Sequence, residues 1–169
     1  SSCLSAEQVL CLPLLYDGLV LIYNKDMFSS ANISSPPDDW QSLREAAVKL
    51  TIWEGDDRTK GTVLRAGVAL GSADNVSYAA DILGLMLSQS EVDPRTNLSG
   101  TAAQDVFTFY TNFVQVDRVW DVQWPDSLSA FAAGKVGMVF APSWEVARLL
   151  ENTTIDLGVA PVPQIPKLE

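Results

Sequence analysis

The apolar positions of this chain form two kinds of run that alternate along the sequence. Residues 18–24 and 136–140 are almost continuously apolar, which is typical of strands buried on both faces of a sheet. A shorter apolar run at 66–70 predicts another strand. The segments between these runs carry apolar residues at helical spacing. This alternation of strands and helices predicts a layered α/β fold with a mixed sheet.

Five helices are expected between the strands. The first extends to about residue 51 and begins at Asp39, a good N-cap that precedes an amphipathic stretch with Trp40 on its apolar face. Gly134 favours the left-handed conformation that ends helices, and it follows another short helical pattern. That helix covers residues 127–133, and the remaining three are predicted at 77–88, from 99 or 100 onward and at 144–150.

The amino-acid composition restricts the possible functions more than the possible folds. The chain has 169 residues, of which 47% are hydrophobic, so a single globular domain is expected. Eleven basic and 21 acidic residues give a net charge of −10, which argues against nucleic acid as a partner because phosphate binding draws on Lys and Arg. No apolar run approaches the roughly 20 residues that a membrane-spanning helix needs.

The sequence offers little for catalysis. It contains no histidine, which excludes a Ser-His-Asp triad, a Cys-His pair and histidine metal sites. Gly134-Lys135 lacks the upstream glycine and the following Ser or Thr of a phosphate-binding loop. The acidic pairs Asp38/Asp39 and Asp56/Asp57 lie in a helix cap and a polar loop, without the apolar pocket that a glycosidase acid needs. We therefore expect no enzyme activity, no cofactor and no metal.

The only cysteines are Cys3 and Cys11. Their separation fits a hairpin that brings them together as well as a helix or strand that keeps them apart. The sequence does not decide whether Cys3 and Cys11 form a disulfide.

Some polar and aromatic residues follow directly after predicted strands. Asp74 and Asn75 follow the strand at 66–70, and Trp144 follows the strand at 136–140. Ligand sites of open α/β sheets lie outside the carboxyl ends of strands. Asp74 and Asn75 are equally typical of a turn, whereas Trp144 is better placed for a cleft than for the core. For Trp40, Trp53 and Trp120 core packing is the better interpretation.

Several short motifs occur in a fixed order between Pro13 and Pro163. They are Tyr23-Asn24-Lys25-Asp26 after a strand, Pro37-Asp38-Asp39-Trp40 at a helix start, Trp124 seven residues before Phe131, Gly134-Lys135 with Met138 at a strand entry, the turn Ser143-Trp144, and Gly158-Val159-Ala160-Pro161-Val162-Pro163 in a last strand. In this order they resemble the second lobe of the extracellular solute-binding proteins of ABC importers, in the branch that includes maltose-binding protein.

The resemblance implies a three-layer, periplasmic-binding-protein-like α/β lobe with a mixed, mostly parallel sheet flanked by helices. Residues 13–163 would form this second lobe, residues 1–12 a hinge-proximal amino-terminal segment, and residues 164–169 a hinge-proximal tail or a vector-derived scar. The chain shows neither an initiator Met nor a signal peptide. We expect it to be a piece of a longer, exported protein whose first lobe is missing here.

The function implied by the resemblance is capture of an extracellular solute, a saccharide, between two lobes that close by a hinge. Delivery to the transmembrane subunits of an ABC permease follows, at the cell exterior or in the periplasm, with the full-length protein anchored to the membrane. An exposed cleft face would also permit a dimer. The alternatives are a ligand-sensing ectodomain coupled to a receptor or kinase and, less favoured, an acidic glycoside hydrolase.

The resemblance also assigns ligand-binding roles. Asp17 matches a position where maltose-binding protein has a sugar-contacting acid, although a solvated acid at a strand end fits equally well. Trp124 and Trp144 match aromatic positions of the family, and indole faces suit the apolar patches of a pyranose. The loop with Asp74 and Asn75 lacks the Glu-Pro-Tyr of maltose-binding protein, so maltose itself is not implied. We expect all five residues to line one face.

Overall fold

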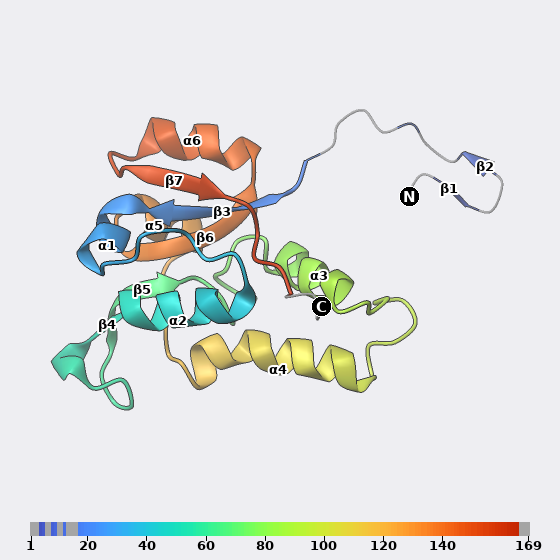
Figure 1. Ribbon diagram of the computed structural model, residues 1–169, viewed down its shortest axis with the longest axis horizontal. Coiled ribbons are helices and arrows are strands. Elements are labelled where there is room, and N and C mark those ends of the chain that lie inside the picture. Colours follow the sequence, from blue (N-terminus) through green and yellow to red (C-terminus); the bar gives the residue numbers. More distant parts are fainter. Residues whose placement is uncertain (1–3, 6–7, 10–11, 13–16, 166–169) are drawn as a thin grey trace.

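The computed structural model describes residues 4–5, 8–9, 12 and 17–165. Cys3 and Cys11, and with them the question of a disulfide, lie outside the described residues. Two short strands, β1 (Leu4–Ser5) and β2 (Gln8–Val9), pair with each other and lie apart from the rest of the fold (Figure 1). The fold that carries the site therefore begins near Asp17.

A five-stranded sheet forms the centre of this fold. Across the sheet the strands follow the order β4 (Ile52–Trp53), β5 (Val63–Val68), β6 (Val136–Pro142), β3 (Leu19–Asn24) and β7 (Leu157–Ala160). The predicted strands at 18–24 and 136–140 are confirmed as β3 and β6, and the strand predicted at 66–70 lies slightly earlier as β5. The short strand β4 has no clear sequence pattern and was not expected.

The directions of the strands make the sheet mixed, as expected. β5 and β6 pair in parallel, whereas β3 pairs antiparallel with both β6 and β7, and β4 pairs antiparallel with β5. β5, β6 and β7 therefore share one direction, but only one of these four pairings is parallel. The expectation of a mostly parallel sheet holds for strand direction and not for neighbouring pairs, because β3 lies between β6 and β7.

Helices flank the sheet, as Figure 1 shows. The helix α2 (Trp40–Leu50) packs on β5 and β6, and α5 (Ser127–Ala132) packs on β6. α6 (Trp144–Asn152) contacts β6, and α3 (Ala79–Gln89) packs against α4 (Thr101–Gln115). Each predicted helix is present within a few residues of its expected bounds. The helices are α1 (Lys25–Ser30), α2 (Trp40–Leu50), α3 (Ala79–Gln89), α4 (Thr101–Gln115), α5 (Ser127–Ala132) and α6 (Trp144–Asn152), with a 3-10 turn at Glu54–Asp56.

The start of α2 illustrates how local sequence and packing agree. The Asp39 side chain accepts a hydrogen bond from the Ser42 backbone N–H at 2.8 Å, and the Ser42 hydroxyl receives the Asp39 N–H in return. This capping box satisfies two donors that the first helical turn leaves free. Trp40 is buried, as predicted, with its ring 5.7 Å from that of Phe140 on β6.

The sheet and α2 approach each other closely at Gly67 of β5. A Cβ atom at this position would lie 1.9 Å from the carbonyl oxygen of Ala47 in α2. The contact is with backbone, which cannot move aside as a flexible side chain can. Gly67 therefore lets α2 lie directly on the strand whose carboxyl end leads into the candidate site.

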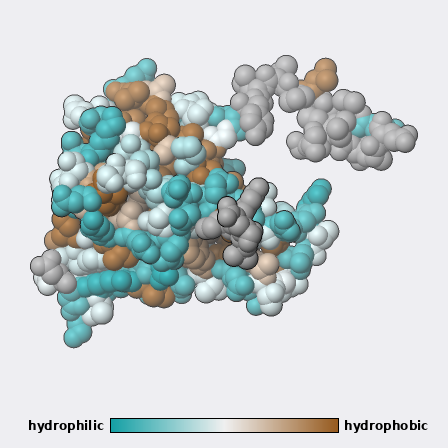
Figure 2. Space-filling view, in the orientation of Figure 1, coloured by the Kyte–Doolittle hydropathy of each residue, from teal (hydrophilic) through white to brown (hydrophobic). Residues whose placement is uncertain are grey.

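Most of the core residues lie on the central strands and on the helices that cover them. Leu21, Ile22, Phe131, Met138 and Phe140 are almost completely buried. The face drawn in Figure 2 mixes hydrophilic with apolar surface, and apolar residues gather over α6. No helix in the described part of the chain is long and apolar enough to cross a membrane.

Candidate functional site

Three segments meet at one edge of the sheet. The parallel strands β5 and β6 end at this edge, and the first residue of β3, Leu19, pairs there with Pro142, the last residue of β6. The edge therefore gathers Asp17 before β3, the loop after β5 and the turn after β6. It is the edge at which the sequence predicted a ligand site.

An open depression of about 620 Å³ lies at this edge. It is large enough for a small organic ligand. Its wall combines aromatic and aliphatic side chains with two carboxylates and two hydroxyls. The lining residues are Asp17, Gly18, Leu19, Tyr78, Asp81, Leu85, Ser88, Pro142, Trp144 and Val162.

Asp17 is exposed, but its carboxylate is fixed in orientation by the turn after β6. Its Oδ1 atom accepts the Ser143 hydroxyl at 2.7 Å, the Gly18 N–H at 2.7 Å and the Ser143 N–H at 3.3 Å. These hydrogen bonds, the one from the Ser143 hydroxyl above all, lower the pKa of Asp17 because they favour the charged form. The Trp144 backbone N–H also lowers this pKa. The three hydrogen bonds with measured distances all end on Oδ1, so among the described residues Oδ2 is the oxygen better placed to accept a ligand hydroxyl.

Replacing Ser143 with alanine should raise the pKa of Asp17 toward its ordinary value. The substitution removes the largest contribution to the lowered pKa, the donated hydroxyl, and leaves the backbone donors of Gly18, Ser143 and Trp144 in place. The measurement is an NMR titration of the Asp17 carboxyl carbon in both proteins. Because the pKa in the folded protein is depressed, the stabilising effect of ionised Asp17 is present above the unfolded pKa. It is lost as the pH falls through the folded pKa. An unchanged Asp17 pKa would contradict the orienting role of Ser143.

Trp144 is the most exposed large side chain of the depression. It is 55% exposed, which agrees with the prediction that it faces a cleft and not the core. Its ring meets the ring of Tyr78 edge to face, with centroids 6.2 Å apart and an interplanar angle of 84°. The two aromatic side chains come from different elements, α6 and the residue before α3, and together form one wall.

Tyr78 is not among the site residues predicted from the sequence. It follows the loop at the carboxyl end of β5, so the argument that selected Trp144 applies to it as well. Its backbone is left-handed, with φ of 61°, which is unusual for a bulky residue and often marks a functional position. Its hydroxyl donates to Oε1 of Glu145 at 2.8 Å. Burial, together with this hydrogen bond, raises the pKa of Tyr78 to about 12.

Asn75 ties the loop after β5 to the segment that contains Trp124. Its side-chain amide donates to the carbonyls of Asp121 at 2.9 Å and Trp124 at 3.0 Å, and its Oδ1 accepts the indole N–H of Trp120 at 2.9 Å. Both amide hydrogens are therefore used within the protein. Asn75 therefore fixes the backbone of the segment that contains Trp124. Direct contact between Asn75 and a ligand stays a prediction.

Asp17 and Trp144 are brought together, whereas the other three predicted residues do not line the depression. Trp124 is half-buried, with its ring 5.6 Å from that of the buried Trp120. Asp74 is exposed and its backbone N–H is bonded to the Ser72 hydroxyl at 3.2 Å. All three belong to segments joined at the same edge of the sheet. That they share one ligand-facing surface with Trp144 stays a prediction.

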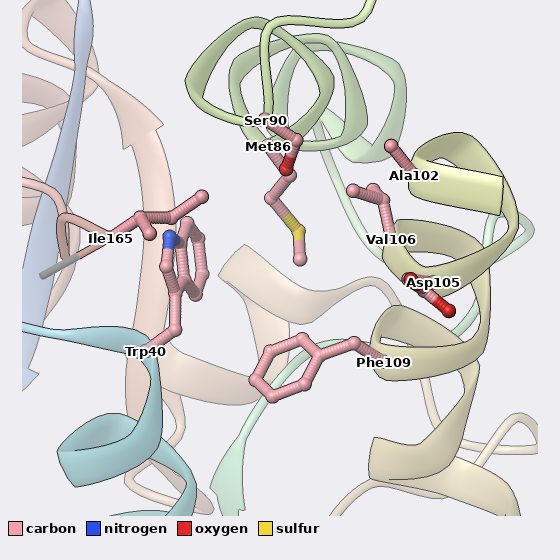
Figure 3. A pocket seen from close by; sticks show the side chains of 8 residues that line it. All are labelled: Trp40, Met86, Ser90, Ala102, Asp105, Val106, Phe109 and Ile165. Carbon is pink, nitrogen blue, oxygen red and sulfur yellow. The ribbon is translucent and has the colours of Figure 1, made fainter. Parts of the chain in front are cut away.

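A second cavity, of about 300 Å³, lies between the start of α2, the end of α3 and α4. Figure 3 shows Trp40, Met86 and Phe109 pointing into it. Its lining is apolar except for Ser90 and Asp105. With few polar groups to meet hydroxyls, it fits a polar ligand less well than the depression at Trp144.

The sequence of residues 5–167 matches the family model described as bacterial extracellular solute-binding protein. A binding protein of Brucella abortus (strain 2308) is 26% identical over 163 residues, which cover 92% of this chain and 38% of that protein. The chain thus spans less than half the length of the curated relatives it matches.

Two solved structures show the same fold. One is an ABC transporter solute-binding protein of Thermotoga lettingae bound with α-D-tagatose, with a TM-score of 0.71 and 20% identity; the match covers 89% of this chain and 40% of that one. The other is the maltose/maltodextrin-binding domain MalE of Bdellovibrio bacteriovorus bound to maltotriose, with a TM-score of 0.66 and 21% identity, covering 87% and 37%. The likeness extends over nearly the whole of this chain and over a minor part of each neighbour.

Proposed function

The chain belongs to the bacterial extracellular solute-binding proteins, and from this premise we propose that it forms one lobe of a protein that captures a saccharide and delivers it to an ABC permease. The second lobe of the cleft would come from the remainder of a longer protein, since relatives are more than twice as long as the matched region. The ligand would be held between the two lobes and released to the transmembrane subunits after hinge opening.

The observation that supports a saccharide most directly is the pairing of Trp144 with Asp17 in one depression. An exposed indole face covers the apolar C–H surface of a sugar ring. An oriented carboxylate accepts hydroxyl hydrogen bonds, and here one oxygen is fixed by Ser143 while, among the described residues, the other is better placed to accept a ligand hydroxyl. A sugar ring, which carries hydroxyl groups beside its apolar C–H face, fits both side chains at once.

The similar structures support the same class of ligand. The Thermotoga lettingae protein binds tagatose and the Bdellovibrio bacteriovorus domain binds maltotriose. Because the same fold binds a monosaccharide and a trisaccharide, the fold alone does not determine the size of the ligand. The residues of the cleft would determine it. In this chain the depression of about 620 Å³ is only one side of the cleft, so we expect poor affinity from the isolated lobe.

The family and its structural neighbours are binding proteins, and we propose that this protein carries out no chemical step on its ligand. In the full-length protein we place the lobe at the cell exterior or in the periplasm, held near the permease by a membrane anchor. The exposed Trp144 also offers apolar surface to a second copy of the isolated lobe, so a dimer through the cleft face is expected when the first lobe is absent.

A thermal-shift screen of the full-length protein tests this proposal. Tagatose, maltotriose and other sugars are compared with amino acids and short peptides at equal concentration. At a free ligand concentration 100 times the dissociation constant, stabilisation is about 2.7 kcal/mol, which raises the melting temperature measurably. Stabilisation by a sugar and not by amino acids is the expected result. Stabilisation by amino acids or peptides alone would refute the saccharide assignment.

A further inference from the structure

A buried carboxylate lies directly behind the aromatic wall of the depression. Glu145 is 2% exposed, although its neighbour Trp144 in the first turn of α6 is 55% exposed. Burying a carboxylate is unfavourable unless hydrogen bonds compensate for the lost water. An acidic residue at this position therefore needs partners, and these partners indicate what it does.

Glu145 has two partners in the described ranges. Its Oε1 accepts the Tyr78 hydroxyl at 2.8 Å and lies 3.3 Å from Nη1 of Arg148. The Arg148 side chain is 71% exposed, so water screens that ion pair and weakens it. The hydrogen bond from Tyr78 is the shorter and less exposed of the two. It joins α6 to the residue before α3, across 67 positions of the sequence.

The backbone of Tyr78 is held in an unfavourable conformation. It adopts the left-handed region, with φ of 61° and ψ of 23°, and makes no side-chain cap to α3. For a residue with a Cβ atom this conformation is strained, and it persists only where the surroundings impose it. The hydrogen bond to Glu145 and the edge-to-face contact with Trp144 orient the Tyr78 side chain, which also packs against the hydrophobic core.

We propose that Glu145 is a positioning residue of the ligand cleft: by accepting the Tyr78 hydroxyl, it holds the Tyr78 ring edge-on to Trp144 and fixes the aromatic wall before ligand binds. The benefit for a saccharide rests on the function proposed above. An indole with one preferred orientation loses less side-chain entropy on binding than a free one. Because the pKa of Tyr78 is about 12, the hydroxyl remains a donor at neutral pH.

Three variants of the full-length protein test this role. Glu145→Gln keeps an oxygen that accepts the Tyr78 hydroxyl, Glu145→Leu removes the acceptor at similar size, and Tyr78→Phe removes the donor alone. The ligand-free readout is near-ultraviolet circular dichroism, to which neighbouring Tyr and Trp rings contribute. The contribution of Trp144 is defined as the signal lost in Trp144→Leu.

Glu145→Leu and Tyr78→Phe should reduce the Trp144 contribution by similar amounts. The double variant Glu145→Leu/Tyr78→Phe should show no further loss of this contribution. Glu145→Gln should retain most of it, which a role in packing alone does not predict. An unchanged Trp144 contribution in Glu145→Leu would overturn the proposal. If far-ultraviolet circular dichroism shows that Glu145→Leu does not fold, Tyr78→Phe decides the question, because it removes a single oxygen. An unchanged Trp144 contribution in that background, measured as the signal lost when Trp144→Leu is added to Tyr78→Phe, overturns the proposal as well.

The effect on binding is measured separately, with D-tagatose and maltotriose as probes. Glu145→Leu should weaken binding roughly threefold to tenfold, the range for an aromatic pair interaction, and should have no added effect in the Tyr78→Phe background. If neither probe binds the unaltered protein while the spectral changes occur, the positioning role stands and the saccharide assignment is the part that fails. Binding unaffected by Glu145→Leu would overturn the proposed benefit to the ligand.

Discussion

Replacing Asn75 with alanine should lower the free energy of unfolding by about 2–3 kcal/mol, although Asn75 is not part of the core. The substitution removes three hydrogen bonds, two donated to the carbonyls of Asp121 and Trp124 and one accepted from the indole of Trp120. Each is worth about 1 kcal/mol net. Trp120 is 1% exposed, so its N–H would lose its partner in a place that water reaches poorly.

Urea unfolding of the 169-residue chain, followed by circular dichroism, measures this difference. Asn152→Ala is the matched control, because Asn152 is exposed and its amide, among the described residues, donates to the carbonyl of Arg148 within α6 and to no other group. The control should change stability by less than about 0.5 kcal/mol. Equal effects of the two substitutions would show that Asn75 does not hold the loop that contains Trp124.

Replacing Trp144 with alanine should weaken ligand binding by about 1–3 kcal/mol without unfolding the lobe. The indole is 55% exposed in the ligand-free lobe, so its removal leaves no large internal cavity. In the complex it would be covered by the ligand, and the loss of a covered aromatic contact has this magnitude. Isothermal titration of the full-length protein with the sugar found in the screen gives the affinity.

Leu150→Ala is the matched control for Trp144. Leu150 is on the same helix, is 58% exposed and does not line the depression. Its replacement should leave the affinity unchanged within about 0.5 kcal/mol. If Trp144→Ala has no larger effect than Leu150→Ala, Trp144 is not part of the binding site.

Much of the fold could be predicted because local patterns and tertiary packing agree. The continuous apolar runs of β3 and β6 and the N-cap before α2 specify these elements from nearby residues alone. The antiparallel placement of β3 between β6 and β7 could not be derived in the same way. Strand order depends on contacts between segments more than a hundred residues apart, which hydrophobic periodicity does not encode.

The site was predictable only in part, for a similar reason. Trp144 was found because a large aromatic after a buried strand is visible in the sequence. The fixed orientation of Asp17 depends on Ser143, which is 126 residues away, and the Tyr78–Glu145 bond spans 67 residues. The amide of Asn75 is polar enough for a ligand contact, but only the structure shows that its donors are already engaged. Side-chain chemistry suggests candidates, and long-range hydrogen bonds decide their roles.

A crystal structure of the full-length protein with its bound sugar tests the central claim most directly. The account predicts that a sugar ring lies against the indole of Trp144, with a hydroxyl within hydrogen-bond distance of Oδ2 of Asp17, and that the other lobe closes over the same depression. A ligand bound elsewhere, for example in the apolar cavity beside Trp40 and Phe109, with Trp144 left exposed to solvent, would contradict it.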